Sequence, residues 1–213
     1  MAENVSFVKS FLGGVVDKKS YRTLVANLFF VYSAIEEEMY RNKDNPSIYP
    51  IYFDQLNRKK SLEKDLVYYY GSDWQVTVKP SAVTEMYVDR IHNVGKHQPE
   101  LLISHAYTRY MGDLSGGQIL KNIAKNAMQL SDDEGTEFYI FRDIQNDKEF
   151  KQRYRKALDS IAVTEQQVNL IISEANVAFS LNMKMFQELN SNIVKIMLML
   201  LSNTINNFRN MIQ

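Results

Sequence analysis

The sequence predicts an all-α fold built as one domain. Apolar residues recur at helical spacing over long stretches, as at Leu24, Leu28 and Ile35, and this spacing is typical of a helix that packs one face against a core. No alternation of apolar and polar residues persists along the chain, so a sheet is not expected. The 213 residues contain no internal repeat and no linker-like segment, which favours a single domain of packed helices.

The first half of the chain is expected to form four helices, over residues 3–12, 17–42, 58–70 and 81–93. Gly71 and Gly95 follow the third and fourth of them, and glycine is common where a helix stops. Pro80 stands just before the fourth helix, where a proline is tolerated. The boundaries of these helices therefore depend on glycine and proline punctuation.

The second half is expected to form a long glycine-bearing helix, a turn-rich connection and two further helices, over residues 99–130, 131–146, 147–161 and 164–190. Within the connection, residues 137–141 are a candidate for a short extended segment. Thr164 followed by Gln167 matches a capping box, which places the start of the last helix. We expect residues 1–190 to form one domain and residues 191–213 to be a C-terminal helical extension.

Composition and charge exclude several classes of function. The 25 Lys and Arg residues balance the 25 Asp and Glu residues, so neither nucleic acid nor an anionic membrane is an expected partner. The absence of cysteine rules out disulfides and thiolate metal ligands. The apolar run at residues 193–201 is interrupted by Lys195 and is far shorter than the roughly 20 residues that span a bilayer. The acidic opening segment is unlike a signal or transit peptide.

The most informative stretch is residues 107–121, YTRYMGDLSGGQILK. A glycine inside a helix costs roughly 0.5–1 kcal/mol relative to alanine, so Gly112, Gly116 and Gly117 need a reason. At about 100° per residue, these glycines and Asp113 share one side of the helix. Two interpretations stay open: another helix crosses closely here, or a flat ligand lies against bare backbone with a carboxylate at its rim.

The motif YTRYMGDLSGGQ resembles the signature of the haem oxygenases, in particular the biliverdin-producing type of cyanobacteria and plastids. Further segments resemble the family in the family's own order, at residues 2–4, 32–42, 52–53, 62–71, 99–118 and 179–189. The resemblance covers residues 1 to about 190. It implies an all-α, single-domain, haem-oxygenase-like bundle.

The activity implied by the resemblance is cleavage of haem to biliverdin IXα, carbon monoxide and Fe²⁺, driven by dioxygen and by electrons from reduced ferredoxin. Haem would be both cofactor and substrate. The chain contains neither a dinucleotide-binding glycine motif nor a P-loop, so the reducing equivalents would come from a separate protein. The resemblance also implies a monomer in the plastid stroma or the cyanobacterial cytoplasm.

The resemblance further implies a catalytic group of Asp113, Arg109 and Tyr52. Asp113 would hold a chain of water molecules that delivers protons to the reacting dioxygen, with Arg109 and Tyr52 in the polar network behind it. Arg109 precedes Asp113 by four residues, a spacing at which helical side chains can pair. The haem would lie against the backbone of three glycines: Gly112, Gly116 and Gly117.

The haem propionates would be bound by Tyr107, Lys151 and Arg155, of which the last two share a helical face. The alternative interpretation is a solvated charged face, and the same surface could receive an acidic ferredoxin. The last helix would wall the pocket with a stripe for which plain core packing is the rival interpretation: Phe179, Asn182, Met183 and Phe186.

The proximal histidine that holds the haem iron in the family would stand just before residues 1–4. The chain begins at Met1, and no metal ligand is assigned to His92, His97 or His105. Glu3 could at best support a water molecule on the iron. Either a preceding segment is missing from the sequence, or the chain is complete and binds haem weakly. The alternatives to an enzyme are therefore a haem-binding protein with weak or no turnover and a helical partner protein that binds no haem.

Overall fold

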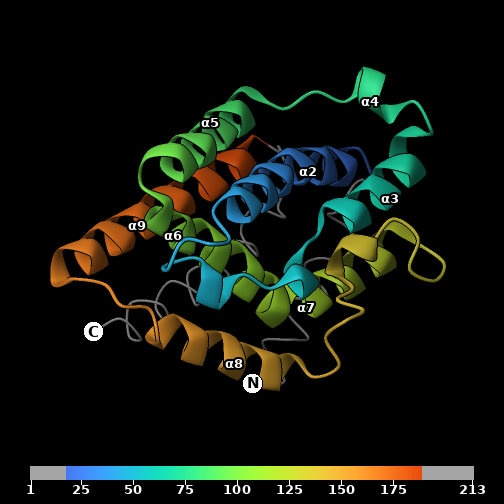
Figure 1. The fold of residues 1–213 in the computed structure, drawn as a ribbon. Helices are drawn as coiled ribbons and strands as arrows, with labels where there is room; N and C mark the ends of the chain where they lie inside the picture. Colours follow the sequence, from blue (N-terminus) through green and yellow to red (C-terminus); the bar gives the residue numbers. More distant parts are fainter. Residues whose placement is uncertain (1–17, 189–213) are drawn as a thin grey trace.

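The computed structural model describes residues 18–188, which form helices and turns without a β-strand among them (Figure 1). The predicted all-α fold is confirmed for this part of the chain. The longer helices are α2 (Lys18–Arg41), α3 (Lys59–Tyr70), α5 (Ala82–His97), α7 (Gly112–Met128), α8 (Asp147–Asp159) and α9 (Glu165–Gln187). Residues 3–12 and 191–213, predicted as helices, lie outside the described residues, and the division of the chain at residue 190 stays a prediction.

Shorter elements connect these helices. The short helices are α4 (Trp74–Thr77) and α6 (Leu102–Ala106), and the 3₁₀ turns are η1 (Tyr49–Ile51), η2 (Asp54–Leu56), η3 (Pro99–Leu101) and η5 (Glu137–Tyr139). No helix in the described part of the chain is both long and apolar enough to cross a membrane.

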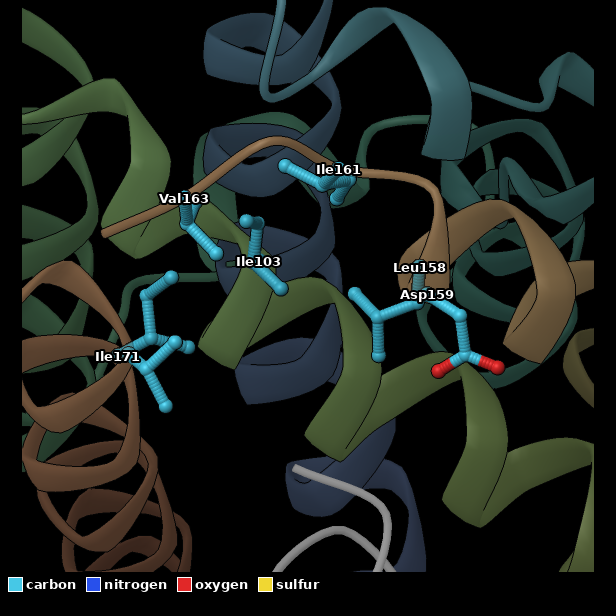
Figure 2. A pocket seen from close by; sticks show the side chains of 7 residues that line it. Ile103, Leu158, Asp159, Ile161, Val163 and Ile171 are labelled. Carbon is cyan, nitrogen blue, oxygen red and sulfur yellow. The ribbon is translucent and has the colours of Figure 1, made fainter. Parts of the chain in front are cut away.

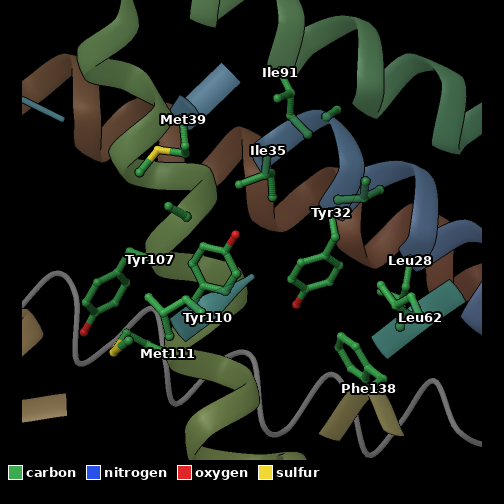
Figure 3. Close-up of a cluster of buried hydrophobic side chains, with 14 of the residues drawn as sticks. Leu28, Tyr32, Ile35, Met39, Leu62, Ile91, Tyr107, Tyr110, Met111 and Phe138 are labelled. Carbon is green, nitrogen blue, oxygen red and sulfur yellow. The ribbon is translucent and has the colours of Figure 1, made fainter. Parts of the chain in front are cut away.

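Helix α2 lies at the centre of the fold and packs against both α3 and α5. Its predicted apolar stripe is buried, and Tyr32 and Ile35 have no exposed surface. Figure 3 shows Leu62 of α3, Ile91 of α5 and Phe138 of η5 gathered around this helix. The core therefore forms around α2, as the helical spacing of its apolar residues predicted.

Several helix ends follow the capping signals in the sequence. The side chain of Thr164 accepts a hydrogen bond from the backbone N–H of Gln167, and the Gln167 side chain accepts one from the Thr164 N–H, which confirms the predicted capping box. Helix α3 ends before Gly71, whose φ is 85°. Its start is capped from another helix, because the Glu36 carboxylate of α2 accepts the backbone N–H groups of Arg58 and Lys59 at 2.5 and 2.9 Å.

The predicted stop of the fourth helix at Gly95 is wrong, because α5 continues through this residue to His97. A Cβ atom at position 95 would lie 2.5 Å from Oε2 and 2.7 Å from Cγ of Glu38 on α2. The glycine therefore serves the close approach of two helices, and a stop signal read from sequence alone cannot distinguish the two uses.

Residues 99–130 were predicted as one helix but form four successive elements. They are η3, α6, a π-helical segment (η4, Tyr107–Met111) and α7. A π-helical turn accommodates one more residue than an α-helical turn and is common at functional sites. All five residues of η4 are buried, so this wide turn lies inside the protein, directly before Gly112 and Asp113.

The predicted extended segment at residues 137–141 is also wrong. Residues Glu137–Tyr139 form the 3₁₀ turn η5. The carboxylate of Asp65, on α3, accepts the backbone N–H groups of Glu137 and Phe138, both at 2.8 Å. A side chain 72 positions away along the chain thus determines the local conformation of η5.

Candidate functional site

A buried polar network meets at Asp113, the second residue of α7. The Tyr32 hydroxyl of α2 donates a hydrogen bond to Oδ2 of Asp113. Arg109, in the π-helical segment, donates from Nη2 to Oδ1 of Asp113 at 3.3 Å and from Nε to the Tyr32 oxygen at 3.0 Å. The Arg109–Asp113 pair expected from their spacing is therefore present, and Tyr32 bonds to both members.

The network continues to the last helix of the described chain. Nη1 of Arg109 donates to Oδ1 of Asn182 on α9 at 2.9 Å, and Nδ2 of Asn182 donates to the Tyr87 hydroxyl on α5 at 2.9 Å. Arg109 is only 3% exposed and Asn182 has no exposed surface. Because buried donors and acceptors that bond to one another restrict each other's positions, the orientation of Arg109 is fixed from two other helices.

Tyr52 was predicted as a member of this network, but the structure places it elsewhere. It follows η1 and lies beside Asp54, and burial together with the Asp54 side chain raises the pKa of Tyr52 to about 12. The hydroxyl that reaches Asp113 belongs to Tyr32 instead. Sequence reasoning assigned Tyr32 no role in the site, although it lies at helical spacing from the apolar residues Leu28 and Ile35. A phenol at such a position was the available signal, since a buried hydroxyl needs a partner.

The surroundings of Asp113 shift its proton affinity. Burial raises the pKa of Asp113, while the charge of Arg109, the hydrogen bond from Tyr32 and the charge of Arg58 oppose the shift. Burial also raises the pKa of Tyr32 well above its usual range, so Tyr32 keeps its proton and remains a donor. The site thus presents a carboxyl group that binds a proton more readily than an exposed aspartate does.

The three glycines of the motif lie in different surroundings. Gly112 is half-buried, whereas Gly116 and Gly117 are buried. A Cβ atom at Gly117 would lie 3.3 Å from Cδ1 of Tyr139 in η5. This glycine was predicted to face a ligand, but the structure packs it against another part of the chain, so the close-approach interpretation holds for Gly117.

Two of the predicted propionate ligands lie together. Burial raises the pKa of Tyr107, and the nearby Arg155 guanidinium of α8 opposes this shift by interacting with the Tyr107 hydroxyl. Lys151, one turn earlier on α8, places its Nζ 3.4 Å from the Leu114 carbonyl oxygen and 3.4 Å from the Ser115 hydroxyl of α7. The three predicted groups therefore line the region between α8 and the helix that carries Asp113.

The predicted stripe on α9 divides into two halves. Phe179 and Met183 are half-buried, whereas Asn182 and Phe186 are fully buried. Asn182 bonds to Arg109, as described above, and Phe186 belongs to the hydrophobic core. Only the half-buried pair offers partly uncovered surface, and Glu3 lies outside the described residues.

The three histidines have surroundings that do not suggest iron ligands. His92 has its Nδ1 2.7 Å from Oε1 of Glu38, and the fully buried His105 has its Nε2 2.9 Å from Oε1 of Glu174. His97 is exposed at the last position of α5. A carboxylate partner is an ordinary structural role for histidine.

An apolar pocket of about 220 Å³ lies away from this network (Figure 2). It lies between α6, the end of α8 and the start of α9, and is lined by Ile103, Leu158, Asp159, Ile161, Val163, Val168 and Ile171. None of the predicted site residues lines it. We therefore locate the candidate site at Asp113 and not at this pocket.

The residues around Asp113 fit a haem group by their chemistry. Two propionates need cationic or hydrogen-bonding partners, and Lys151, Arg155 and the Tyr107 hydroxyl supply them between α7 and α8. The half-buried backbone at Gly112 carries no side chain that would keep a flat macrocycle away. Asp113, next to this glycine, supplies a carboxyl group with raised proton affinity.

Comparison with known proteins supports this interpretation. The family model described as "Heme oxygenase" matches residues 1–188. The chain is 65% identical over 208 residues to the heme oxygenase of the red alga Porphyra purpurea, covering 98% of this chain and 88% of that protein. It is 56% identical over 205 residues to heme oxygenase 1 of Nostoc sp., covering 96% and 86%.

A solved structure shares the fold. The crystal structure of heme oxygenase-1 from the cyanobacterium Synechocystis sp. in complex with heme superimposes with a TM-score of 0.82 at 56% sequence identity, covering 96% of this chain and 92% of that one. The family match spans most of the chain, and the identity to named relatives is far above the level at which folds alone are shared. The chain therefore belongs to the haem oxygenase family.

Proposed function

We propose that this haem oxygenase cleaves haem to biliverdin IXα, carbon monoxide and Fe²⁺ in a reaction that consumes dioxygen, electrons and protons and releases water. The observation that carries the proposal is the mostly covered Asp113 carboxyl, held by Tyr32 and Arg109 beside a half-buried glycine. The structure of a relative in complex with heme supports haem as the ligand. When bound, haem supplies the iron chemistry that activates dioxygen.

In this proposal the chain's own residues move protons and orient the ligand. Asp113 carries protons at its carboxyl oxygens, and Tyr32 and Arg109 hold each of these oxygens in place. A positioned carboxyl group that exchanges protons with water is an effective general acid, with a contribution of roughly 10²–10⁴-fold. Gly112 and Gly116 leave room for the macrocycle, and Tyr107, Lys151 and Arg155 bind its propionates.

The test is a turnover assay with haem, dioxygen and a reduced ferredoxin, in which biliverdin and carbon monoxide are measured together. We expect Asp113→Asn to reduce biliverdin formed per haem consumed by about 10-fold or more, since it removes the general acid. The matched control is Asp133→Asn, a half-buried aspartate that pairs with Lys121.

Three different results would each contradict a different part of the proposal. Undiminished biliverdin from Asp113→Asn would remove this residue from the mechanism. A Soret band that persists unchanged under reductant and oxygen would indicate a haem-binding protein without turnover. A flat haem titration would indicate a helical partner protein that binds no haem.

Reduced ferredoxin is the proposed electron donor, and the basic surface of α8 is its proposed docking site. Lys148 and Lys156 are exposed at the two ends of this helix, and a positive surface accelerates association with an acidic partner. The Lys148→Glu/Lys156→Glu variant should need several-fold more ferredoxin for half-maximal rate, and the difference should shrink at high salt. The charge-matched variant Lys60→Glu/Lys79→Glu, elsewhere on the exposed surface, should leave the rate unchanged. Equal effects of both variants would contradict docking on α8.

The red algal and cyanobacterial relatives support a plastid stroma or cyanobacterial cytoplasm as the site of action. A monomer is proposed, and sedimentation at micromolar concentration tests it. A dimer mass would contradict this part of the proposal.

A further inference from the structure

Asp65 is a buried carboxylate that the proposed chemistry does not use. It lies on α3 with no exposed surface. Its two oxygens accept the backbone N–H groups of Glu137 and Phe138, each at 2.8 Å, and it forms no ion pair within residues 18–188. Burying a carboxylate without a cationic partner is costly, so the η5 turn that it holds should serve more than local packing.

The turn η5 reaches the Asp113 network in two directions. The Phe138 ring packs edge-on against the Tyr32 ring, with centroids 5.3 Å apart at 67°, and Figure 3 shows the two rings side by side. On the other side, the Tyr139 carbonyl accepts a hydrogen bond from Nε2 of Gln118 at 3.0 Å. The same residue is the close neighbour of Gly117 described above. The turn therefore contacts both Tyr32 and the helix that carries Asp113.

We propose that Asp65 is a positioning residue for haem oxygenation. Its carboxylate fixes the backbone of η5, the Phe138 ring then fixes the Tyr32 ring, and the Tyr32 hydroxyl is thereby held on Asp113. The inference rests on the proposed role of Asp113 in proton delivery. Asp65 acts through Phe138 and Tyr32 and contacts neither Asp113 nor Arg109 by a hydrogen bond.

The substitution Asp65→Asn tests whether the carboxylate acts through its hydrogen bonds or only fills space. Its side chain has the same shape, but it offers one oxygen acceptor and one NH₂ donor. One of the two backbone N–H groups would then face a donor and lose its hydrogen bond, and a buried donor without a partner is destabilising. The backbone at Phe138 should shift as a result, and the Tyr32 ring with it.

Other ionisable groups surround Asp65, and a titration of Asp113 is interpretable only where their protonation states do not change. Burial raises the pKa of Asp65 to about 7, and the charges that act on it are those of Glu137 and Lys64. The phenols that face it are Tyr21, Tyr69 and Tyr139. Burial raises the pKa of each phenol above its usual range, so all three stay neutral while Asp113 titrates.

The first experiment uses the full chain without haem. The carboxyl carbon of Asp113 is followed by ¹³C NMR as a function of pH and is assigned with Asp113→Asn. Because the Tyr32 hydrogen bond lowers the pKa of Asp113, Asp65→Asn should raise that pKa by about half a unit or more. The control Asp73→Asn, at an exposed aspartate just beyond α3, should leave it unchanged.

The second experiment measures turnover with haem and ferredoxin. Asp65→Asn should lower kcat about 3- to 10-fold while the haem KM stays within about twofold, because proton delivery is disturbed and haem binding is not. Phe138→Leu, which keeps both backbone hydrogen bonds to Asp65, should also raise the pKa of Asp113. The double variant should add little to either single change, since both act through one contact.

An Asp113 titration that is unchanged in folded Asp65→Asn would overturn the inference. So would equal losses in kcat and haem affinity, because they indicate a merely structural role. If Asp65→Asn does not fold, the same titration is made on folded Phe138→Leu. An Asp113 pKa equal to that of the wild type in that variant refutes the inference. If the wild-type chain forms no biliverdin, the proposed function fails while the NMR titration still tests whether Asp65 controls Asp113.

Discussion

Arg155 and Tyr107 come from different helical segments and meet at the predicted propionate edge. The Arg155 guanidinium lies close enough to the Tyr107 hydroxyl to oppose the rise in its pKa that burial causes, so the two groups are neighbours before any ligand binds. A guanidinium that is already oriented loses less side-chain entropy when it binds a carboxylate. The edge is therefore preorganised on this side, whereas Lys151 has only two long contacts of 3.4 Å.

We predict that Arg155→Met weakens haem binding about 5- to 10-fold, because a charge-assisted hydrogen bond contributes roughly 1.5–3 kcal/mol before screening by solvent. The measurement is a Soret titration with haem and, in parallel, with haem dimethyl ester. Binding of the ester should be nearly unchanged, since the ester has no propionate charge.

Arg153→Met is the matched control, because the Arg153 guanidinium lies over the rings of Phe53 and Phe150 on another side of the same helix. A similar loss for haem and its ester in Arg155→Met would show that Arg155 supports packing and does not bind propionates.

At the residue scale, the sequence identified Asp113, Arg109 and their contact, but it did not identify Tyr32 as the hydrogen-bond partner of both. Arg109 and Asp113 are four residues apart, so helical geometry alone brings them together. Tyr32 is 81 positions from Asp113, and its place in the network depends on how α2 packs against α7. Such long-range pairing is set by tertiary packing and has no local signature.

Among the elements, α2 and α5 make a close contact at Gly95. The buried Glu38 side chain occupies the space beside the glycine and is itself held by His92 at 2.7 Å and Arg41 at 2.7 Å. A side chain held by two partners cannot move aside without losing them.

We predict that Gly95→Ala destabilises the protein by about 1–3 kcal/mol, because overpacking costs more than the roughly 1 kcal/mol that alanine gains in a helix. Urea unfolding followed by circular dichroism measures the change. The comparison variant is Asn93→Ala, exposed on the same helix, which should be neutral or slightly stabilising. A stabilised Gly95→Ala would mean that Glu38 gives way and that the contact is loose.

At the element scale, helices with strong apolar spacing and clear caps were predicted to within a few residues, as for α3 and α9. Several short elements were missed, among them the π-helical segment, the helix α4 and the 3₁₀ form of η5. The conformation of η5 depends on a distant residue, because Asp65 of α3 accepts two of its backbone N–H groups. Local propensity is a weak guide where the backbone's hydrogen-bond partners come from another element.

Across the whole molecule, Glu174 ties three helices together. From α9 it accepts hydrogen bonds from Arg90 of α5, at 2.9 Å from Nε, and pairs with Nε2 of His105 of α6 at 2.9 Å. Burial alone would raise the pKa of Glu174, but the hydrogen bonds from His105 and Arg90 outweigh it and lower the pKa to about 2.

This lowered pKa makes stability depend on pH in one direction. The folded-state pKa lies below the usual value of 4.5, so the stabilisation is fully present above pH 4.5 and is lost as the pH falls from 4.5 towards 2. We predict that Glu174→Gln lowers the free energy of unfolding by about 2–4 kcal/mol at pH 7. The difference from wild type should shrink at pH 2–3.

Urea unfolding at a series of pH values measures this dependence. Glu165→Gln, at the exposed start of the same helix, serves as the control. Its free energy of unfolding should stay close to that of the wild type at every pH. A gap between wild type and Glu174→Gln that stays constant down to pH 2 would contradict the linkage.

The wide turn at Tyr107–Met111 also determines where this helix tolerates a deletion. A π-helical turn is an α-helical turn with one residue inserted, so removing a single residue there lets the turn relax to the ordinary α-helical repeat and leaves the downstream side chains in their directions. Regular α-helix has no such spare residue, and a deletion in it rotates everything beyond by about 100° relative to what precedes. A deletion in the wide turn should therefore leave Asp113 pointing at Tyr32, whereas deletion of Leu114 should turn Gly116 away from the side of the helix that carries the acid group.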